Sequence, residues 1–137
     1  MSTLQIDYDF DRIDRRTGTI SPSLINVIKN RIVQFYRPDK IILFGSCATK
    51  NTFTDSDIDL FIVLNDHHPF SSKKRHERMG ELLELFRYRS FALNSIVMTN
   101  SEIKKLIHTN EGEWDFILEI LEKGKTLYDR PEKTNIE

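Results

Sequence analysis

Two short apolar runs, joined by a polar segment, most constrain what this chain can fold into. The first run is Ile41–Phe44 and the second is Leu60–Leu64. Each has the length of a buried strand and is rich in β-branched or aromatic residues. The first run ends at Gly45-Ser46, and the second is entered through Asp57-Ile58-Asp59. The pattern predicts a hairpin-like pair of strands with a polar loop between them.

The acids before the second run alternate with apolar residues. Side chains at i and i+2 of a strand point to the same face, so we expect Asp57 and Asp59 to project together. Two adjacent carboxylates repel each other unless something neutralises them. Mg²⁺ is a cation that such oxygens hold, typically through one or two carboxylates plus phosphate oxygens. We therefore predict that Asp57 and Asp59 are metal ligands.

The Gly45-Ser46 step supplies the complementary half of such a site. Glycine lets the backbone approach a phosphate closely, and the serine hydroxyl and nearby N–H groups donate to its oxygens. A polyphosphate at Gly45 and Ser46, bridged by metal to Asp57 and Asp59, is the arrangement required for phosphoryl or nucleotidyl transfer.

The acidic segment allows two other interpretations. The acids could form a charged turn that merely precedes a strand, with Asp55 as its cap. They also match the start of a calcium loop of the D-x-D-x-D type. The calcium loop is disfavoured because Leu60 stands where such loops require glycine, and an apolar strand follows.

Gly45-Ser46, ten further residues and then Asp57-x-Asp59 before an apolar strand resemble the signature of the polymerase-β-like nucleotidyltransferases. The short chain resembles their minimal branch, the antitoxin-type nucleotidyltransferases that are paired with HEPN-domain toxins. The resemblance covers roughly residues 22 to 131, and its last part is a helix followed by Glu122-x-Gly124-x-x-Leu127-Tyr128.

The resemblance implies a protein adenylyltransferase. ATP would be the substrate, with two Mg²⁺ ions held by Asp57 and Asp59. Gly45 and Ser46 would bind the β- and γ-phosphates, and Ser46, Asp57 and Asp59 would be the catalytic residues. The acceptor would be a tyrosine hydroxyl of a HEPN ribonuclease toxin, which the transferred AMP would silence.

The chain departs from the family pattern at one position. Members that catalyse carry a third carboxylate on the next strand, and in this sequence that position falls on Asn94. An asparagine amide cannot act as a base. An alternative is therefore a protein with impaired catalysis that neutralises its partner by binding alone. A third reading, an antibiotic-modifying nucleotidyltransferase, is disfavoured because no second domain remains to hold a sugar.

Bulk properties set the remaining limits. The 137 residues fit one domain, and a net charge of −1 gives no basic field for nucleic acid, so we expect no direct nucleic-acid binding. No apolar run approaches the ~20 residues of a membrane helix, no signal peptide opens the chain, and the single Cys47 fits a reducing compartment. We expect a cytoplasmic protein without membrane contact.

The chain divides into three parts. Residues 1–20 are expected to be an N-terminal extension, either solvated or an arm anchored on a partner by Tyr8, Phe10 and Ile13. Residues 21–131 form the nucleotidyltransferase-like domain, and residues 132–137 form a disordered tail.

Hydrophobic periods and capping residues predict the other elements. Helices are expected from Pro22 to about Tyr36, from a cap at Ser71 or Ser72 to about Phe86, over about Glu102–His108 after a Thr99 cap, and over Trp114–Lys123 up to a Gly124 cap; strands are expected over Phe91–Met98 and Lys125–Tyr128. Phe116 is placed in the core, and the basic cluster Lys73–Arg78 is either a solvated face or a contact surface. The fold class is α/β (α+β), a small mixed sheet flanked by helices.

Overall fold

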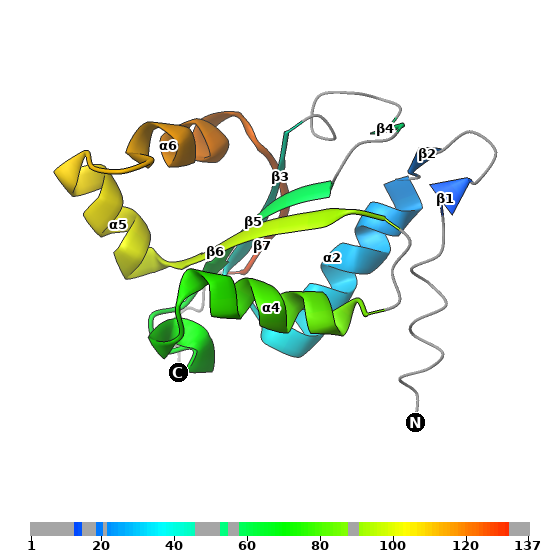
Figure 1. Cartoon of the computed structure of the whole chain (residues 1–137), viewed down its shortest axis with the longest axis horizontal. Coiled ribbons are helices and arrows are strands. Elements are labelled where there is room, and N and C mark those ends of the chain that lie inside the picture. Colours follow the sequence, from blue (N-terminus) through cyan, green and yellow to red (C-terminus); the bar gives the residue numbers. More distant parts are fainter. Residues whose placement is uncertain are drawn as a thin grey trace.

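The computed structural model describes residues 13–14, 19–20, 22–45, 53–54, 58–87 and 91–131 (Figure 1). Its larger elements are α2 (Pro22–Tyr36), β3 (Lys40–Phe44), β5 (Ile58–Leu64), α4 (Arg75–Leu85), β6 (Leu93–Thr99), α5 (Asn100–Thr109), α6 (Trp114–Lys123) and β7 (Lys125–Asp129). The predicted helices and strands of this region are therefore confirmed, with small shifts at their ends.

The main sheet has four strands in the order β6-β5-β3-β7. Strand β3 pairs antiparallel with β5 and with β7, whereas β5 pairs parallel with β6. The predicted small mixed sheet flanked by helices is confirmed.

Helices cover both faces of this sheet, and each face has its own core (Figure 1). Residues at i and i+2 of a strand share a face, so Ile41 and Leu43 pack with α2 and α4, while Ile42 and Phe44 face α5 and α6. Strand β5 contributes to both cores and is buried at every position except Asp59, which is half-buried. Asp59 is thus the polar exception in the central strand.

A second, smaller sheet was not predicted. It joins β1 (Ile13–Asp14), β2 (Thr19–Ile20) and β4 (Phe53–Thr54), antiparallel and in the order β1-β2-β4. The pairing of β2 with β4 connects the segment before α2 to the loop between β3 and β5. Strands of two residues carry too little alternation to be recognised from a sequence.

The region before α4 differs from the prediction. Ser71 and Ser72 do not cap α4; they belong to a 3₁₀ helix, η1 (Pro69–Ser72), and Lys74 is the N-cap residue. Glu77 accepts from the backbone N–H of Lys74, with 2.9 Å between the two atoms. This local bond gives the helix a start that needs no serine.

The prediction that the whole basic cluster Lys73–Arg78 is exposed is wrong for Arg78. Its side chain is fully buried, and its guanidinium donates two hydrogen bonds to the Glu102 carboxylate, at 2.7 and 2.9 Å. It also donates to the backbone carbonyls of Phe70, Ser71 and Val97. Arg78 therefore connects η1, β6 and α5, and it is not available to a phosphate or an acidic partner.

The last two helices have the predicted caps. Thr99 accepts from the backbone N–H of Glu102, and the Glu102 side chain accepts from the backbone N–H of Thr99, which forms a capping box at the start of α5. Gly124 ends α6 at a negative φ of −70°. Because this φ is open to any residue, glycine is not needed here for its backbone conformation. It is needed for its size, since a Cβ at this position would collide with the Ile42 side chain.

In the part of the chain that the structure describes, no helix is long and apolar enough to cross a membrane.

Candidate functional site

Three side chains meet at one end of the main sheet. Asp59 lies opposite Phe44 in the antiparallel pair β3·β5 and beside Asn94 in the parallel pair β5·β6. Residues in register share a face of the sheet, and Phe44 belongs to the core on the α5/α6 side. Phe44, Asp59 and Asn94 therefore extend that face to the end of the sheet where β3 stops and β5 and β6 begin.

Gly45 brings the backbone against the acid. Its φ is +76°, a conformation that favours glycine, and a Cβ built on it would collide with Oδ2 of Asp59. Only a residue without a side chain fits between the end of β3 and this carboxylate. The structure thus brings together Gly45 and Asp59, as the sequence analysis expects. The other two predicted site residues, Ser46 and Asp57, lie outside the described residues.

Asn94 occupies the position next to the acid. Its Nδ2 donates to Oδ1 of Asp59, with 3.1 Å between the two atoms. The amide supplies a donor where a carboxylate would have supplied a second negative charge. It can orient Asp59, but it cannot accept a proton from an attacking hydroxyl.

The carboxylate of Asp59 could bind a metal at this end of the sheet. Among the described residues no cluster of three or more His, Cys, Asp or Glu side chains is present, so a metal here would depend on Asp59 together with Asp57 and the phosphates of a ligand. The space beside Oδ2, which a Cβ at residue 45 would fill, is kept free by glycine. Donor chemistry and space therefore fit a magnesium ion.

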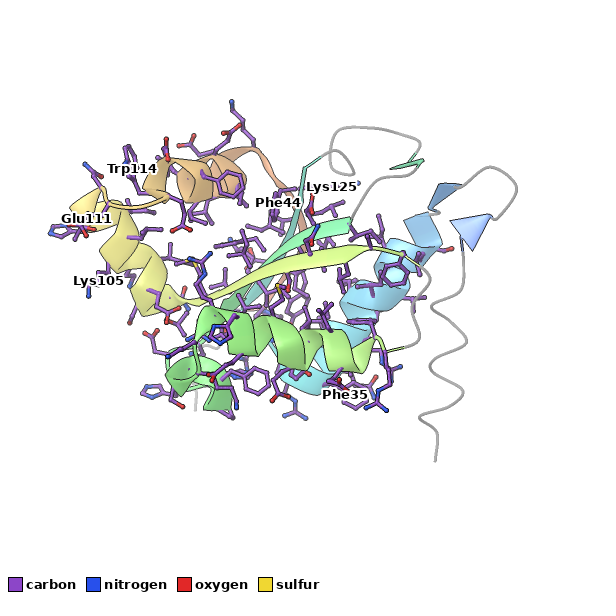
Figure 2. All side chains as sticks on the ribbon, viewed as in Figure 1. Phe35, Phe44, Lys105, Glu111, Trp114 and Lys125 are labelled. Carbon is purple, nitrogen blue, oxygen red and sulfur yellow. The ribbon has the colours of Figure 1, made fainter. Side chains whose placement is uncertain are left out.

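A pocket of about 480 Å³ opens beside this site. Residues of the sheet and of α6 line it: Phe44, Gly45, Asp59, Phe116, Glu119, Ile120, Lys123 and Gly124. Figure 2 shows Phe44 at the end of β3, next to α6. The prediction that Phe116 faces the core is wrong, because its side chain is 45% exposed. This side of the site was not predicted, although Phe116, Glu119 and Lys123 share one helical face by spacing.

A larger pocket of about 730 Å³ lies elsewhere, at the end of the sheet where β3 begins. Its charged residues are largely paired with one another. Asp39 lies 3.4 Å from Arg130 and accepts from Asn100, and Lys40 lies 3.9 Å from Asp129. We assign the candidate site to the smaller pocket because it contains Asp59 and Gly45. We call the turn of the backbone at Gly45 the glycine corner.

Comparisons with known proteins identify the family of the chain. The sequence profile of the family described as "Polymerase beta, Nucleotidyltransferase" matches residues 26–133. A comparison with curated proteins gives no significant match. The crystal structure of a candidate nucleotidyltransferase from Sulfolobus solfataricus is similar at 18% identity and a TM-score of 0.45, covering 77% of this chain and 80% of that one. The family match spans most of the chain and stands independently of this structural likeness.

Proposed function

The chain belongs to the polymerase β nucleotidyltransferase family, and from this premise we propose that it is an antitoxin that transfers AMP from ATP to a partner protein. The acceptor is a hydroxyl, specifically that of a tyrosine, on a HEPN-type ribonuclease toxin. Modification of that hydroxyl silences the toxin.

The observation that carries the proposal is the contact between the glycine corner and the acid. Gly45 leaves the backbone at the end of β3 open against Oδ2 of Asp59, and a pocket starts at these two residues. A polyphosphate bound at the corner would lie beside a carboxylate that shares a metal with it. Nucleotidyl transfer requires this juxtaposition because charge must be neutralised where the phosphates separate.

In the proposed reaction the acceptor oxygen attacks the α-phosphorus of ATP. The new oxygen–phosphorus bond forms while the bond between the α- and β-phosphates breaks, and pyrophosphate leaves. Magnesium, when bound by Asp57 and Asp59, supplies Lewis-acid stabilisation of the phosphates. Gly45 and Ser46 hold the β- and γ-phosphates, and Asn94 keeps the Asp59 carboxylate oriented through the bond to Oδ1. The hydroxyl proton passes to solvent or to an acid of the partner.

The direct test is incubation of the protein with Mg²⁺, ATP labelled at the α-phosphate, and the candidate toxin encoded next to it. We expect label on the toxin and a mass increase of one AMP, and we expect Asp59→Asn to abolish both. Absence of transfer with the partner present would contradict the proposal.

A second candidate function is neutralisation by binding alone. It is favoured by Asn94, which stands beside Asp59 where a carboxylate would help remove the acceptor's proton. The double variant Asp57→Asn, Asp59→Asn separates the two functions. If cells that produce this variant still survive the toxin, binding suffices; if protection is lost while the complex still forms, transfer is required.

A further inference from the structure

We propose that the exposed face of α6 is the second wall of the nucleotide site and that it is built for a ribonucleoside triphosphate. Phe116 stacks on the base, Glu119 accepts hydrogen bonds from the ribose hydroxyls, and Lys123 faces the polyphosphate. This inference rests on the proposed function and adds to it the residues that select the nucleotide.

The C-terminal end of α6 lies at the glycine corner. Strand β7 follows α6 directly, and its first residue, Lys125, is in register with Leu43. Gly124 packs so closely that a Cβ would meet the carbonyl oxygen of Leu43 at 3.2 Å. Lys123 therefore stands beside the end of β3, where Gly45 turns the chain, and both residues line the pocket. A lysine ammonium is a compact positive charge suited to a phosphate at that corner.

The aromatic part of the wall, Phe116, lies about two helical turns from Lys123 along α6. Phe116 and Phe44 form an edge-to-face pair with 5.9 Å between ring centroids. This contact fixes the Phe116 ring while 45% of the residue stays exposed. Stacking on a base would cover the exposed part of this ring.

Glu119 lies between these two residues on the same helical face. With a rise of ~1.5 Å per residue, Glu119 is about 4.5 Å along the axis from Phe116 and Lys123 is about 10.5 Å from it. A nucleotide presents base, ribose and phosphates in the same order. Within the described part of the chain, Glu119 and Lys123 form no ion pair, so their charges are not already used by a neighbour.

The test measures dissociation constants of the full chain for three probes in the presence of Mg²⁺: ATP, dATP and tripolyphosphate. Phe116→Ala is expected to weaken ATP binding about tenfold and leave tripolyphosphate binding unchanged. Lys123→Met is expected to weaken both by about tenfold. Glu119→Leu is expected to remove the preference for ATP over dATP, because leucine has no oxygen that could accept from the 2′-hydroxyl.

Matched controls exist on other elements. Phe35 is 48% exposed on α2, which packs against the opposite face of the sheet, and Lys105 is exposed on α5. Figure 2 shows both away from Phe44. Phe35→Ala and Lys105→Met should bind all three probes like the unmodified protein.

The possible results separate this inference from the proposed function. If Asp59→Asn weakens ATP binding but the three α6 variants bind like the unmodified protein, the α6 wall is wrong and the proposed function stands. If the α6 variants lose only the toxin complex, the face is a protein-docking surface and the inference is overturned. If the unmodified protein binds no ATP, the proposed function fails as well.

Discussion

Asn94 donates a hydrogen bond from Nδ2 to Oδ1 of Asp59, and the two residues are directly in register across the parallel strands β5 and β6. The other carboxylate oxygen, Oδ2, faces Gly45. Asp59 is therefore oriented by an amide on one side and opens toward the glycine corner on the other.

Asn94→Asp replaces the amide donor by a second carboxylate. The melting temperature of this variant should depend on Mg²⁺. Without metal, two acids in register repel each other and lower the melting temperature. With Mg²⁺ the loss should be reversed, because both carboxylates can then bind the ion, and transfer to the partner should be faster. Melting curves with and without Mg²⁺ measure the effect. Asn94→Ala, which adds no charge, should show no such dependence; an equal response of the two variants would contradict the prediction.

Gly45→Ala should disrupt the site. The φ of +76° is strained for alanine, and its methyl group would collide with the Asp59 carboxylate, so we expect a loss of about 1–3 kcal/mol in the free energy of unfolding and no measurable ATP binding. Denaturant titration and calorimetry measure the two effects.

Gly80→Ala is the matched control. Gly80 lies within α4, and a Cβ there meets nothing within 4 Å. Alanine should stabilise the helix by about 0.5–1 kcal/mol and leave ATP binding unchanged. If Gly45→Ala behaved like Gly80→Ala, the close approach of Gly45 to Asp59 would be wrong.

Arg78→Met should destabilise the protein strongly. It removes two charged hydrogen bonds from Glu102 and the Arg78 donors from the carbonyls of Ser71 and Val97. Glu102 is 39% exposed, so water replaces part of the lost pairing, but a buried acceptor left without a donor costs about 1–3 kcal/mol. The control is Arg87→Met. Arg87 pairs with Glu84 at 2.6 Å, but the two side chains are 62% and 65% exposed, so its loss should change the stability by about 0–1 kcal/mol. Urea unfolding measures the free energy of unfolding of both variants. Equal losses in the two variants would contradict a stabilising role of Arg78.

The same pair predicts a pH dependence. The pKa of Glu102 is lowered from its ordinary value of 4.5, chiefly because Arg78 donates to the carboxylate, and in addition because the N–H of Thr99 does so; burial opposes the shift. Since the folded protein binds this proton less tightly than the unfolded chain, Glu102 contributes its full stability above pH 4.5 and loses it as the pH falls through the lowered value.

Glu102→Gln tests this dependence. The variant should be less stable than the unmodified protein at neutral pH, and the difference between their melting temperatures should shrink below about pH 4.5. The pKa values of Asp66 and Glu77 are also lowered, mainly by hydrogen bonds from Ser101 and from the backbone of Lys74 respectively. These two acids are present in both proteins, so they cancel in the comparison. A difference that stays constant with pH would contradict the assignment.

Several features of the site follow from local patterns. The lengths and residue types of β3 and β5 predict buried strands, and the motif Gly45-Ser46…Asp57-x-Asp59 predicts a glycine corner and an acid at their ends. The Thr99 capping box and the break at Gly124 also follow from neighbouring residues. Each of these signals lies within a few positions of the feature it predicts, so they are readable without the fold.

Other features could not be predicted because they depend on packing between distant segments. From the sequence, Arg78 is expected to be exposed like the other basic residues of its helix. It is buried because η1, β6 and α5 surround it. The spacing of Phe116 with other apolar residues of α6 predicts a core position. In the fold it lies at the pocket, where 45% of the residue stays exposed.

The sequence by itself determined the strands, the alternation that sets Asp59 apart from its apolar neighbours, and the family to which the motif points. The tertiary structure gave the register of Asn94 with Asp59 and the contact between that carboxylate and Gly45, for which the motif supplied only an expectation. It alone decided that α6 lines the pocket and that Phe116 lies there half exposed. The reason is that strand period and helix caps arise from adjacent residues. Register across a parallel pair and the docking of a helix on a sheet arise from burying whole surfaces at once.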